Sequence, residues 1–417
     1  MAITQQSLIG WQAVEASEDL KILSYVLDHL GDEELLLALE AERAGRRDKY
    51  PLRAVWNAFL ASIVLGHGTI AALIRELRRN AELRQVLGFD PMLGSDAVPP
   101  SYVFSRLLNK LLKHSEAVER IFKNLVSKLF ELIPDFGERL AADGKAIHSV
   151  RKSDNEAGAG KKTTTDEGET VVYTWHGFKI HCLCDAVHEL PIAFEVTAAN
   201  ENDSPHLLPL LEKAFGEHSE LDERAKSVAA DKGYDDGGDK KTIHDLYGMA
   251  PIIPPRDLEK GVHKPLDANH HDTIYVAPDG EVCCRIDPFQ EETAKQYCAM
   301  EFRGYESDRG TLKFRCPAAA FGVECKNKEA CRSTKKDQGY GRTLRIPTEK
   351  NPRLFLPVYT KSRHFVDLYK MRTSIERLFY RLDHLFGMEV PLRTMGLAKA
   401  KLRVGLAMSA MVATALG

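Results

Sequence analysis

The chain has 417 residues, of which 44% are hydrophobic and 28% are charged, and its formal net charge is −3. This is the composition of an ordinary soluble globular protein with two or three domains. The small net charge argues against an affinity for nucleic acid that is spread over the whole surface.

The two ends of the chain carry no pattern that predicts export or membrane insertion. Residues 1–10 lack a charged segment followed by an apolar one, and the apolar stretch 404–416 is too short to span a bilayer. We therefore expect a protein that works in the cytoplasm of a bacterium-like cell and has no membrane partner. We expect residues 404–416 to form a buried helix. Eight cysteines in such a chain are expected to be thiols or metal ligands rather than disulfides.

Residues 1–135 show helical periodicity. Asp32 is a candidate N-cap, Pro51 opens a helix that ends near Gly66, and Thr69 is a candidate cap for residues 70–79. Residues 101–113 and 116–132 are two further amphipathic runs. The pattern suits a helix-turn-helix-type DNA-binding domain and a plain helical bundle equally well. In the first case, the basic residues of the run 70–79 would contact DNA: Arg75, Arg78 and Arg79.

From residue 136 the pattern changes to that of a mixed α/β sheet. The phrase Leu-Ala-Ala-Asp that ends at Asp143 recurs as Val-Ala-Ala-Asp, which ends at Asp231. A short run of small apolar residues predicts a strand buried on both faces, with the aspartate at its end. Residues 171–185 and 192–197 are further strands, residues 205–215 and 237–247 are helices, and the polar segment 151–170 is expected to be a mobile loop. We assign residues 136–254 and 366–417 to this domain.

Residues 255–365 are interpreted as an insertion with several short strands. The segments 273–276 and 281–284 flank a turn and predict a hairpin, and 312–316 and 343–346 are further strands. Between Lys326 and Arg381 the chain has 15 Lys and Arg against 5 Asp and Glu, a local net of +10. Such a stretch suits contact with a polyanion, although a basic solvated surface without a partner is common.

A helix after the insertion supplies a third acid. Tyr369, Arg372, Glu376 and Asp383 would share one side of it, beside an apolar arc that packs on the sheet. Glu376 is either a carboxylate beside Asp143 and Asp231 or the partner of an i,i+4 ion pair with Arg372. Because all three acids lie at the edges of apolar elements, we favour the first.

Three carboxylates that meet would repel one another unless cations lie between them, and a carboxylate site suits Mg²⁺ or Mn²⁺. Two such ions could activate a water or a 3′-hydroxyl and stabilise the leaving oxygen of a phosphodiester. The neighbouring basic residues would then position phosphates: Lys145, Arg372, Arg377 and Arg381.

These motifs resemble the DDE transposases of bacterial insertion sequences, whose catalytic domain has a ribonuclease H-like fold. The matches are Asp143-Gly144, Asp231 with Gly233-Tyr234-Asp235 after it, and the spacing of Tyr369, Arg372 and Glu376. Residues 177–185 and 200–203 are similar to the family's second and third strands and the loop that follows. Residues 74–89 are similar to its N-terminal domain. The family's motif ends on a Lys that contacts DNA, and here the position is Asp383.

The resemblance implies an enzyme that cleaves and joins double-stranded DNA at the ends of an insertion sequence, with Asp143, Asp231 and Glu376 as metal-binding catalytic acids and Tyr369 in the DNA-binding helix. It also implies a homodimer on DNA. Two alternatives stay open: a nuclease of the same fold that never joins strands, and a domesticated or inactive DNA-binding protein whose acids are relics.

The insertion also carries a cysteine cluster. Four thiolates around Zn²⁺ could stabilise a small domain that lacks a core of its own. The spacing contains no CxxC pair, so free or buried thiols are the alternative. The four residues chosen as zinc ligands are Cys284, Cys316, Cys325 and Cys331.

Overall fold

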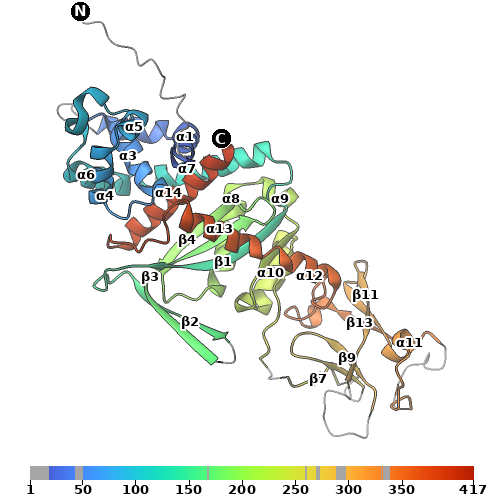
Figure 1. Ribbon diagram of the computed structural model, residues 1–417. Coiled ribbons are helices and arrows are strands. Elements are labelled where there is room, and N and C mark those ends of the chain that lie inside the picture. Colours follow the sequence, from blue (N-terminus) through green and yellow to red (C-terminus); the bar gives the residue numbers. More distant parts are fainter. Residues whose placement is uncertain are drawn as a thin grey trace, which may run out of the picture.

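The computed structural model describes residues 18–42, 50–166, 169–258, 261–268, 273–287, 297–329, 331 and 339–417. It has N-terminal helices, a central sheet with helices around it, and a smaller part rich in strands (Figure 1). The prediction about residues 1–10 lies outside the described residues. None of the described helices combines the length and the apolar character of a bilayer span.

The predicted N-terminal helices are confirmed. The elements of this part are α1 (Glu18–His29), α2 (Glu33–Ala41), α3 (Leu52–Val64), α4 (Ile70–Arg79), α5 (Ala81–Val86), η2 (Pro91–Ala97), α6 (Ser101–Lys113) and α7 (Ser115–Leu132).

One predicted cap is confirmed and another is wrong. Thr69 accepts a hydrogen bond of 3.1 Å from the backbone N–H of Ala72 and so caps α4. Asp32 precedes α2, but its side chain makes no cap hydrogen bond. The carboxylate is buried and accepts instead from Arg53 Nη1 at 2.5 Å and from Trp56 Nε1. A buried carboxylate is better satisfied by a guanidinium and an indole than by one terminal amide.

The central sheet has the predicted mixed character. Its strands are β1 (Arg139–His148), β2 (Gly158–Asp166), β3 (Glu169–Asp185), β4 (Pro191–Ala198), β5 (Ser227–Ala230) and β6 (Ala250–Ile252). The order is β2-β3-β1-β5-β6, and β4 also pairs with β3. Strands β1, β5 and β6 run parallel, whereas β3 is antiparallel to β1, β2 and β4.

Strand β3 is long enough to belong to two pairings. Its second half, residues 178–185, lies between β1 and β4, and its first half forms a hairpin with β2 that projects from the sheet (Figure 1). The prediction of a mobile loop over residues 151–170 is therefore wrong for 158–166. The pairing uses backbone hydrogen bonds, which a polar side-chain pattern does not reveal.

Several helices flank the sheet. They are η3 (Ser204–His206), α8 (Leu207–Glu217), α9 (Glu220–Arg224), η4 (Lys232–Tyr234), α10 (Gly237–Tyr247), α12 (Arg363–Lys370), α13 (Thr373–His384) and α14 (Leu397–Leu416). Helix α8 contacts β3 and β4, whereas α13 contacts β1 and β3.

The predicted single helix after the insertion is two helices. Met371 and Arg372 keep helical dihedral angles, but the hydrogen bonds around them change to i to i+3 turns: Ser374 N–H bonds to Met371 O, and Ile375 N–H bonds to Arg372 O. Thr373 donates its hydroxyl to Lys370 O at 3.0 Å. A Thr side chain that bonds to the local backbone in this way competes with the helix ladder.

The insertion consists of two small antiparallel sheets. The four-stranded sheet has the order β10-β9-β8-β7, with β7 (Lys264–Pro265), β8 (Ile274–Val276), β9 (Val282–Arg285) and β10 (Tyr297–Ala299). The other contains β11 (Glu301–Glu306), β12 (Thr311–Arg315) and β13 (Thr343–Pro347), with α11 (Pro317–Phe321) and η6 (Thr348–Lys350) beside it. The predicted hairpin and both further strands are confirmed.

The described residues form two large hydrophobic cores and a small third cluster of Ala229, Ile252 and Phe365. One continuous core runs from Leu20 to Ala413 and includes the N-terminal helices, the sheet and α14. Helix α14 is buried along most of its length, as predicted for residues 404–416, and contacts α1, α3, α7 and β4. The insertion has a core of its own, which includes Phe314, Phe355 and Tyr359. The N-terminal helices therefore share their core with the sheet, whereas the insertion has a core of its own and touches the sheet where Val358 packs against the cluster of Ala229, Ile252 and Phe365.

Candidate active site

Two of the predicted acids are neighbours on adjacent strands. The parallel register pairs Ala142 of β1 with Ala230 of β5, and the next residues are Asp143 and Asp231. Strand β5 ends there, as predicted. Strand β1 continues to His148, because its antiparallel partner β3 pairs with it beyond the end of β5. Asp143 therefore lies within a strand rather than at its end.

Burial and neighbouring charges raise the pKa of Asp143 to about 6. Burial is the largest cause, and the carboxylates of Asp231 and Asp203 act in the same direction. The backbone N–H of Gly144, 2.7 Å from Asp143 Oδ1, and the guanidinium of Arg372 oppose them. A carboxylate held beside two others is in an environment that a divalent cation would relieve.

Glu376 lies in the first turn of α13 and is connected to Asp143 through Arg372. Arg372 Nη2 is 2.6 Å from Glu376 Oε1, and Arg372 Nη1 is 3.4 Å from Asp143 Oδ2. The Glu376 side chain is 53% exposed. The i,i+4 ion pair considered from the sequence is therefore present, and the same guanidinium bridges two of the acids.

The acids do not form a ready metal site. Among the described residues, no three His, Cys, Asp or Glu side chains form a group that could hold a metal ion. Glu376 is paired with Arg372 in this structure, and its binding of a metal ion together with Asp143 and Asp231 stays a prediction. The pair Asp143 and Asp231 fits a divalent cation by donor type and by mutual repulsion.

Lys145 and Asp383 form an ion pair beside the acids. Lys145 follows Asp143 on the same face of β1, and its Nζ is 2.6 Å from Asp383 Oδ2 on α13. The ammonium also lies 5.9 Å from the ring centroid of Phe379. Asp383 occupies the position at which the resembled motif has Lys, and it is paired with Lys145 of β1.

Gly144 faces the other side of β1 and admits a fourth carboxylate. A Cβ atom at Gly144 would lie 2.4 Å from Asp203 Oδ1, so any other residue here would force the Asp203 side chain to move. Asp203 also lies 3.0 Å from Lys179 Nζ and 3.4 Å from the buried His181 Nδ1. Burial lowers the pKa of His181 to about 3, so this ring is neutral near pH 7.

A family model described as a transposase DDE domain matches residues 134–412, about two thirds of the chain. The protein belongs to the DDE transposase family. The match covers Asp143, Asp231 and Glu376, and it ends within α14. A comparison with curated proteins finds no match.

The basic residues predicted to contact DNA in this transposase differ in their surroundings. Arg377 and Arg381 of α13 both pair with Glu189, the second at 3.3 Å, so the predicted outward stripe is partly neutralised. Tyr369 is half-buried, stacks on Phe365 and has the Arg372 guanidinium 5.8 Å from its ring centroid.

On α4, by contrast, the three predicted arginines are exposed. Only Arg79 has an ion-pair partner among the described residues, and that partner is Glu76 in the same helix. Arg84 caps the helix by donating to the carbonyls of Leu77 and Arg78. The exposed face of α4 therefore keeps most of its positive charge.

The sequence reasoning missed Glu189 and the part played by Asp203. Residues 200–203 had been singled out for their resemblance to a family loop, which was a usable signal for Asp203. Glu189 lies in the turn between β3 and β4 with a left-handed backbone (φ 58°), and no motif marked it. Only the fold brings that turn against α13.

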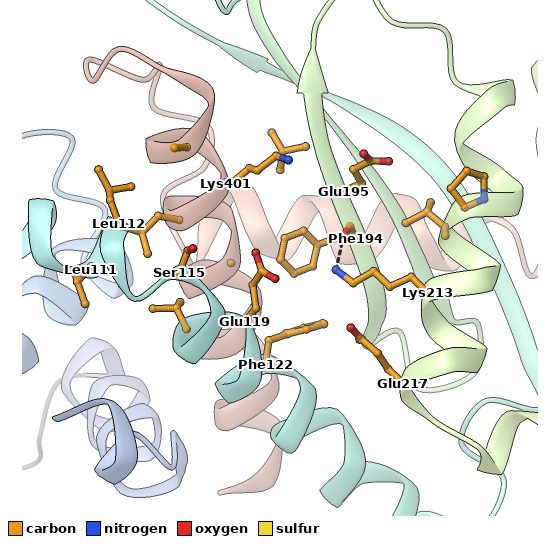
Figure 2. A pocket seen from close by; sticks show the side chains of 17 residues that line it. Leu111, Leu112, Ser115, Glu119, Phe122, Phe194, Glu195, Lys213, Glu217 and Lys401 are labelled. Atoms are coloured by element: carbon orange, nitrogen blue, oxygen red, sulfur yellow. Dashed lines mark hydrogen bonds between the residues drawn. The ribbon is translucent and has the colours of Figure 1, made fainter. Parts of the chain in front are cut away.

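A cavity lies away from these acids, at the junction of the N-terminal helices with the sheet. It has a volume of about 470 Å³ and is enclosed by α6, α7, β4, α8 and α14 (Figure 2). Phe122 and Phe194 form its apolar wall, and Lys213 donates to Phe194 O at 3.3 Å. None of Asp143, Asp231 and Glu376 lines it, so it belongs to the junction of the N-terminal helices with the sheet.

Proposed function

We propose that this protein cleaves DNA and joins the cut strands at the ends of an insertion sequence, using Asp143, Asp231 and Glu376. The observation that carries the proposal is the placement of Asp143 and Asp231 side by side at the end of β5, with Arg372 joining Asp143 to Glu376. This arrangement lies inside the family match.

Asp143 and Asp231 are the residues that would hold Mg²⁺ or Mn²⁺, and Glu376 would join them when it separates from Arg372. Bound ions of this kind activate a water or 3′-hydroxyl and stabilise the leaving oxygen of a phosphodiester. Oxygen donors select these ions over zinc.

Arg372 has two tasks in this proposal. Without DNA it neutralises Asp143 and Glu376, which lowers the repulsion within the site. A DNA phosphate offers the same guanidinium a bidentate partner, and the exchange would release Glu376 toward the aspartates. Arg372 thereby couples the arrival of the substrate to the assembly of the acids.

The remaining DNA contacts follow from exposure and charge. The exposed arginines of α4 give the N-terminal helices a basic surface for double-stranded DNA, which supports their assignment to the recognition of element ends. Lys145 is neutralised by Asp383 and contributes less. Two ends must be processed together, so we infer a homodimer on DNA that works in the bacterial cytoplasm.

The test uses the DNA that flanks the gene. A plasmid that carries both flanks around a marker is incubated with the full chain and Mg²⁺, and cut and joined products are measured separately. We expect both products. Asp143→Asn, Asp231→Asn and Glu376→Gln should each abolish both while the affinity for DNA is kept, whereas Asp222→Asn, at an exposed position on α9, should have no effect.

The two alternatives predict other products. Cleavage without joining would identify a nuclease of the same fold, and binding without cleavage would identify a DNA-binding protein whose acids are relics. Cleavage by the Asp143→Asn protein would contradict the assignment of the acids.

A further inference from the structure

Three cysteine-bearing segments of the insertion converge although they are distant in the chain. Cys284 lies on β9, Cys316 directly follows β12, and Cys325 and Cys331 lie in the segment after α11. All four are free thiols that are partly buried. They belong to both small sheets and to the segment that connects β12 with β13.

Backbone hydrogen bonds fasten the Cys325 segment to the end of β9. The N–H groups of Lys326 and Asn327 both donate to Ile286 O, at 3.0 and 3.1 Å. Ile286 is two residues after Cys284, and Lys326 is one residue after Cys325. The two cysteines are therefore brought together by contacts of the main chain and not by side-chain packing alone.

Arg342 connects Cys316 to the same place. The N–H of Cys316 donates to Arg342 O at 2.8 Å, and Arg342 Nη1 donates to Thr273 Oγ1 at 2.9 Å. Thr273 O accepts from the N–H of Arg285, the residue after Cys284. Cys316 and the residue after Cys284 are thus joined through Thr273 and the buried Arg342.

Cys331 lies on the same fastened segment as Cys325. The N–H of Cys331 donates to Lys328 O at 3.2 Å, one residue after Asn327, whose own N–H bonds to Ile286 O beyond the end of β9. The main chain therefore holds the segments of all four cysteines against one another.

We propose that Cys284, Cys316, Cys325 and Cys331 bind a structural Zn²⁺ that fastens the segment 316–331 to the four-stranded sheet of the insertion. Four thiolates in tetrahedral geometry are the preferred donors of zinc and leave no open position for a substrate. This site is separate from the carboxylates of the catalytic domain in place and in donor chemistry.

Two features of the insertion fit this assignment. Its hydrophobic core is small and separate from the main one, and small domains of this kind gain folding free energy from a metal. Arg342 is a buried cation whose side chain donates to the neutral hydroxyl of Thr273. A zinc ion with four thiolates has a net charge of −2, which would stabilise the guanidinium.

The thiols are not yet arranged around a metal. No three of these side chains, or of any other His, Cys, Asp or Glu in the described residues, form a group that could hold an ion. The inference therefore includes a closing movement of the thiols and the loss of their protons when zinc binds.

The experiment measures zinc in the full chain, purified without chelators from cells grown with added zinc. Mass spectrometry of the metal should find one zinc ion per chain, and replacement by Co²⁺ should give the absorption of thiolate-bound cobalt. Cys284→Ser and Cys331→Ser should each lose the zinc. Cys283→Ser is the matched control, because Cys283 precedes Cys284 on β9 and faces the other side.

Several results would overturn the proposal. One is a wild-type chain that takes up no zinc, and a second is zinc retained by both ligand variants. A third is a pair of disulfides among the four cysteines in the unreduced protein. Loss of zinc in Cys298→Ser, whose residue pairs with Cys284 across β9 and β10, would overturn the choice of ligands. The wild-type measurement decides the matter even where a variant fails to fold.

Discussion

Substituting Asp235 should loosen the attachment of the insertion to the catalytic domain. The Asp235 carboxylate is fully buried and lies 2.6 Å from Lys240 Nζ, which is also fully buried. Its other oxygen accepts from Arg353 Nε at 2.8 Å and from the N–H of Arg256 at 2.7 Å. Arg256 and Arg353 lie near the two ends of the insertion, so one carboxylate fixes both, four residues after Asp231.

Asp235→Asn keeps the shape of the side chain and removes its charge. Lys240 is then left without its ion-pair partner in a site where burial already lowers the pKa of the ammonium. Removing one member of a buried ion pair costs about 3–5 kcal/mol. We expect the free energy of unfolding, measured in urea, to fall by about that amount, and limited proteolysis to cut first within the insertion.

The matched control is an exposed pair on the same helix. Lys241 and Asp245 of α10 pair at i,i+4, and both side chains are at least half exposed. Asp245→Asn should change the free energy of unfolding by at most about 0.5 kcal/mol. An Asp235→Asn protein that is within about 1 kcal/mol of wild type would refute the reasoning from burial.

Three more substitutions test the site and the fold. Gly144→Ala puts a Cβ 2.4 Å from Asp203 Oδ1, so we expect a loss of about 1–3 kcal/mol in urea unfolding and loss of DNA cleavage. Burial lowers the pKa of His218 from 6.5 to about 4. As the pH falls, His218 is therefore protonated in the unfolded chain before it is protonated in the folded chain. Stability should therefore fall by up to about 3 kcal/mol between pH 6.5 and 4, and less in His218→Gln. Asp383→Asn frees Lys145 to contact a DNA phosphate, which should raise the affinity for DNA. The slope of the logarithm of the binding constant against the logarithm of the salt concentration should become steeper by about one.

Each of these has a control. Gly216 lies near the end of α8 with nothing within 4 Å of a Cβ, so Gly216→Ala should be neutral or stabilising by up to about 1 kcal/mol. Equal pH profiles for wild type and His218→Gln would contradict the second prediction. The gain from Asp383→Asn should disappear when Lys145→Met is added, and a gain that persists would exclude Lys145 as its source.

The secondary structure and the pairing of the two aspartates could be read from the sequence because both depend on local patterns. The repeated run of small apolar residues before Asp143 and Asp231 indicates buried strands, and buried parallel strands lie side by side in a sheet. The buried helix at 404–416 followed in the same way from its mostly apolar residues.

The predictions that were wrong concern segments whose structure depends on contacts that the local sequence pattern does not show. The segment around β2 is polar, and for that reason a loop was predicted there. The break at Met371 and Arg372 depends on a local hydroxyl contact, which helical periodicity does not register.

The same limit applies to the site. Arg372 could be predicted to pair with Glu376 from their spacing, but its second contact, to Asp143, requires the packing of α13 on β1. With both contacts made, Arg372 joins Asp143 to Glu376, and the three acids form no group among the described residues that could hold a metal ion. Spacing along a helix alone could not show this.

The most direct test of the central claim is the binding of Mn²⁺ to the full chain, followed by electron paramagnetic resonance with and without DNA from the gene's flanks. We expect Asp143→Asn and Asp231→Asn to lose binding in both conditions. Glu376→Gln should weaken binding chiefly when DNA is present, because DNA is what separates Glu376 from Arg372. Binding curves that are the same for wild type and all three variants would contradict the account.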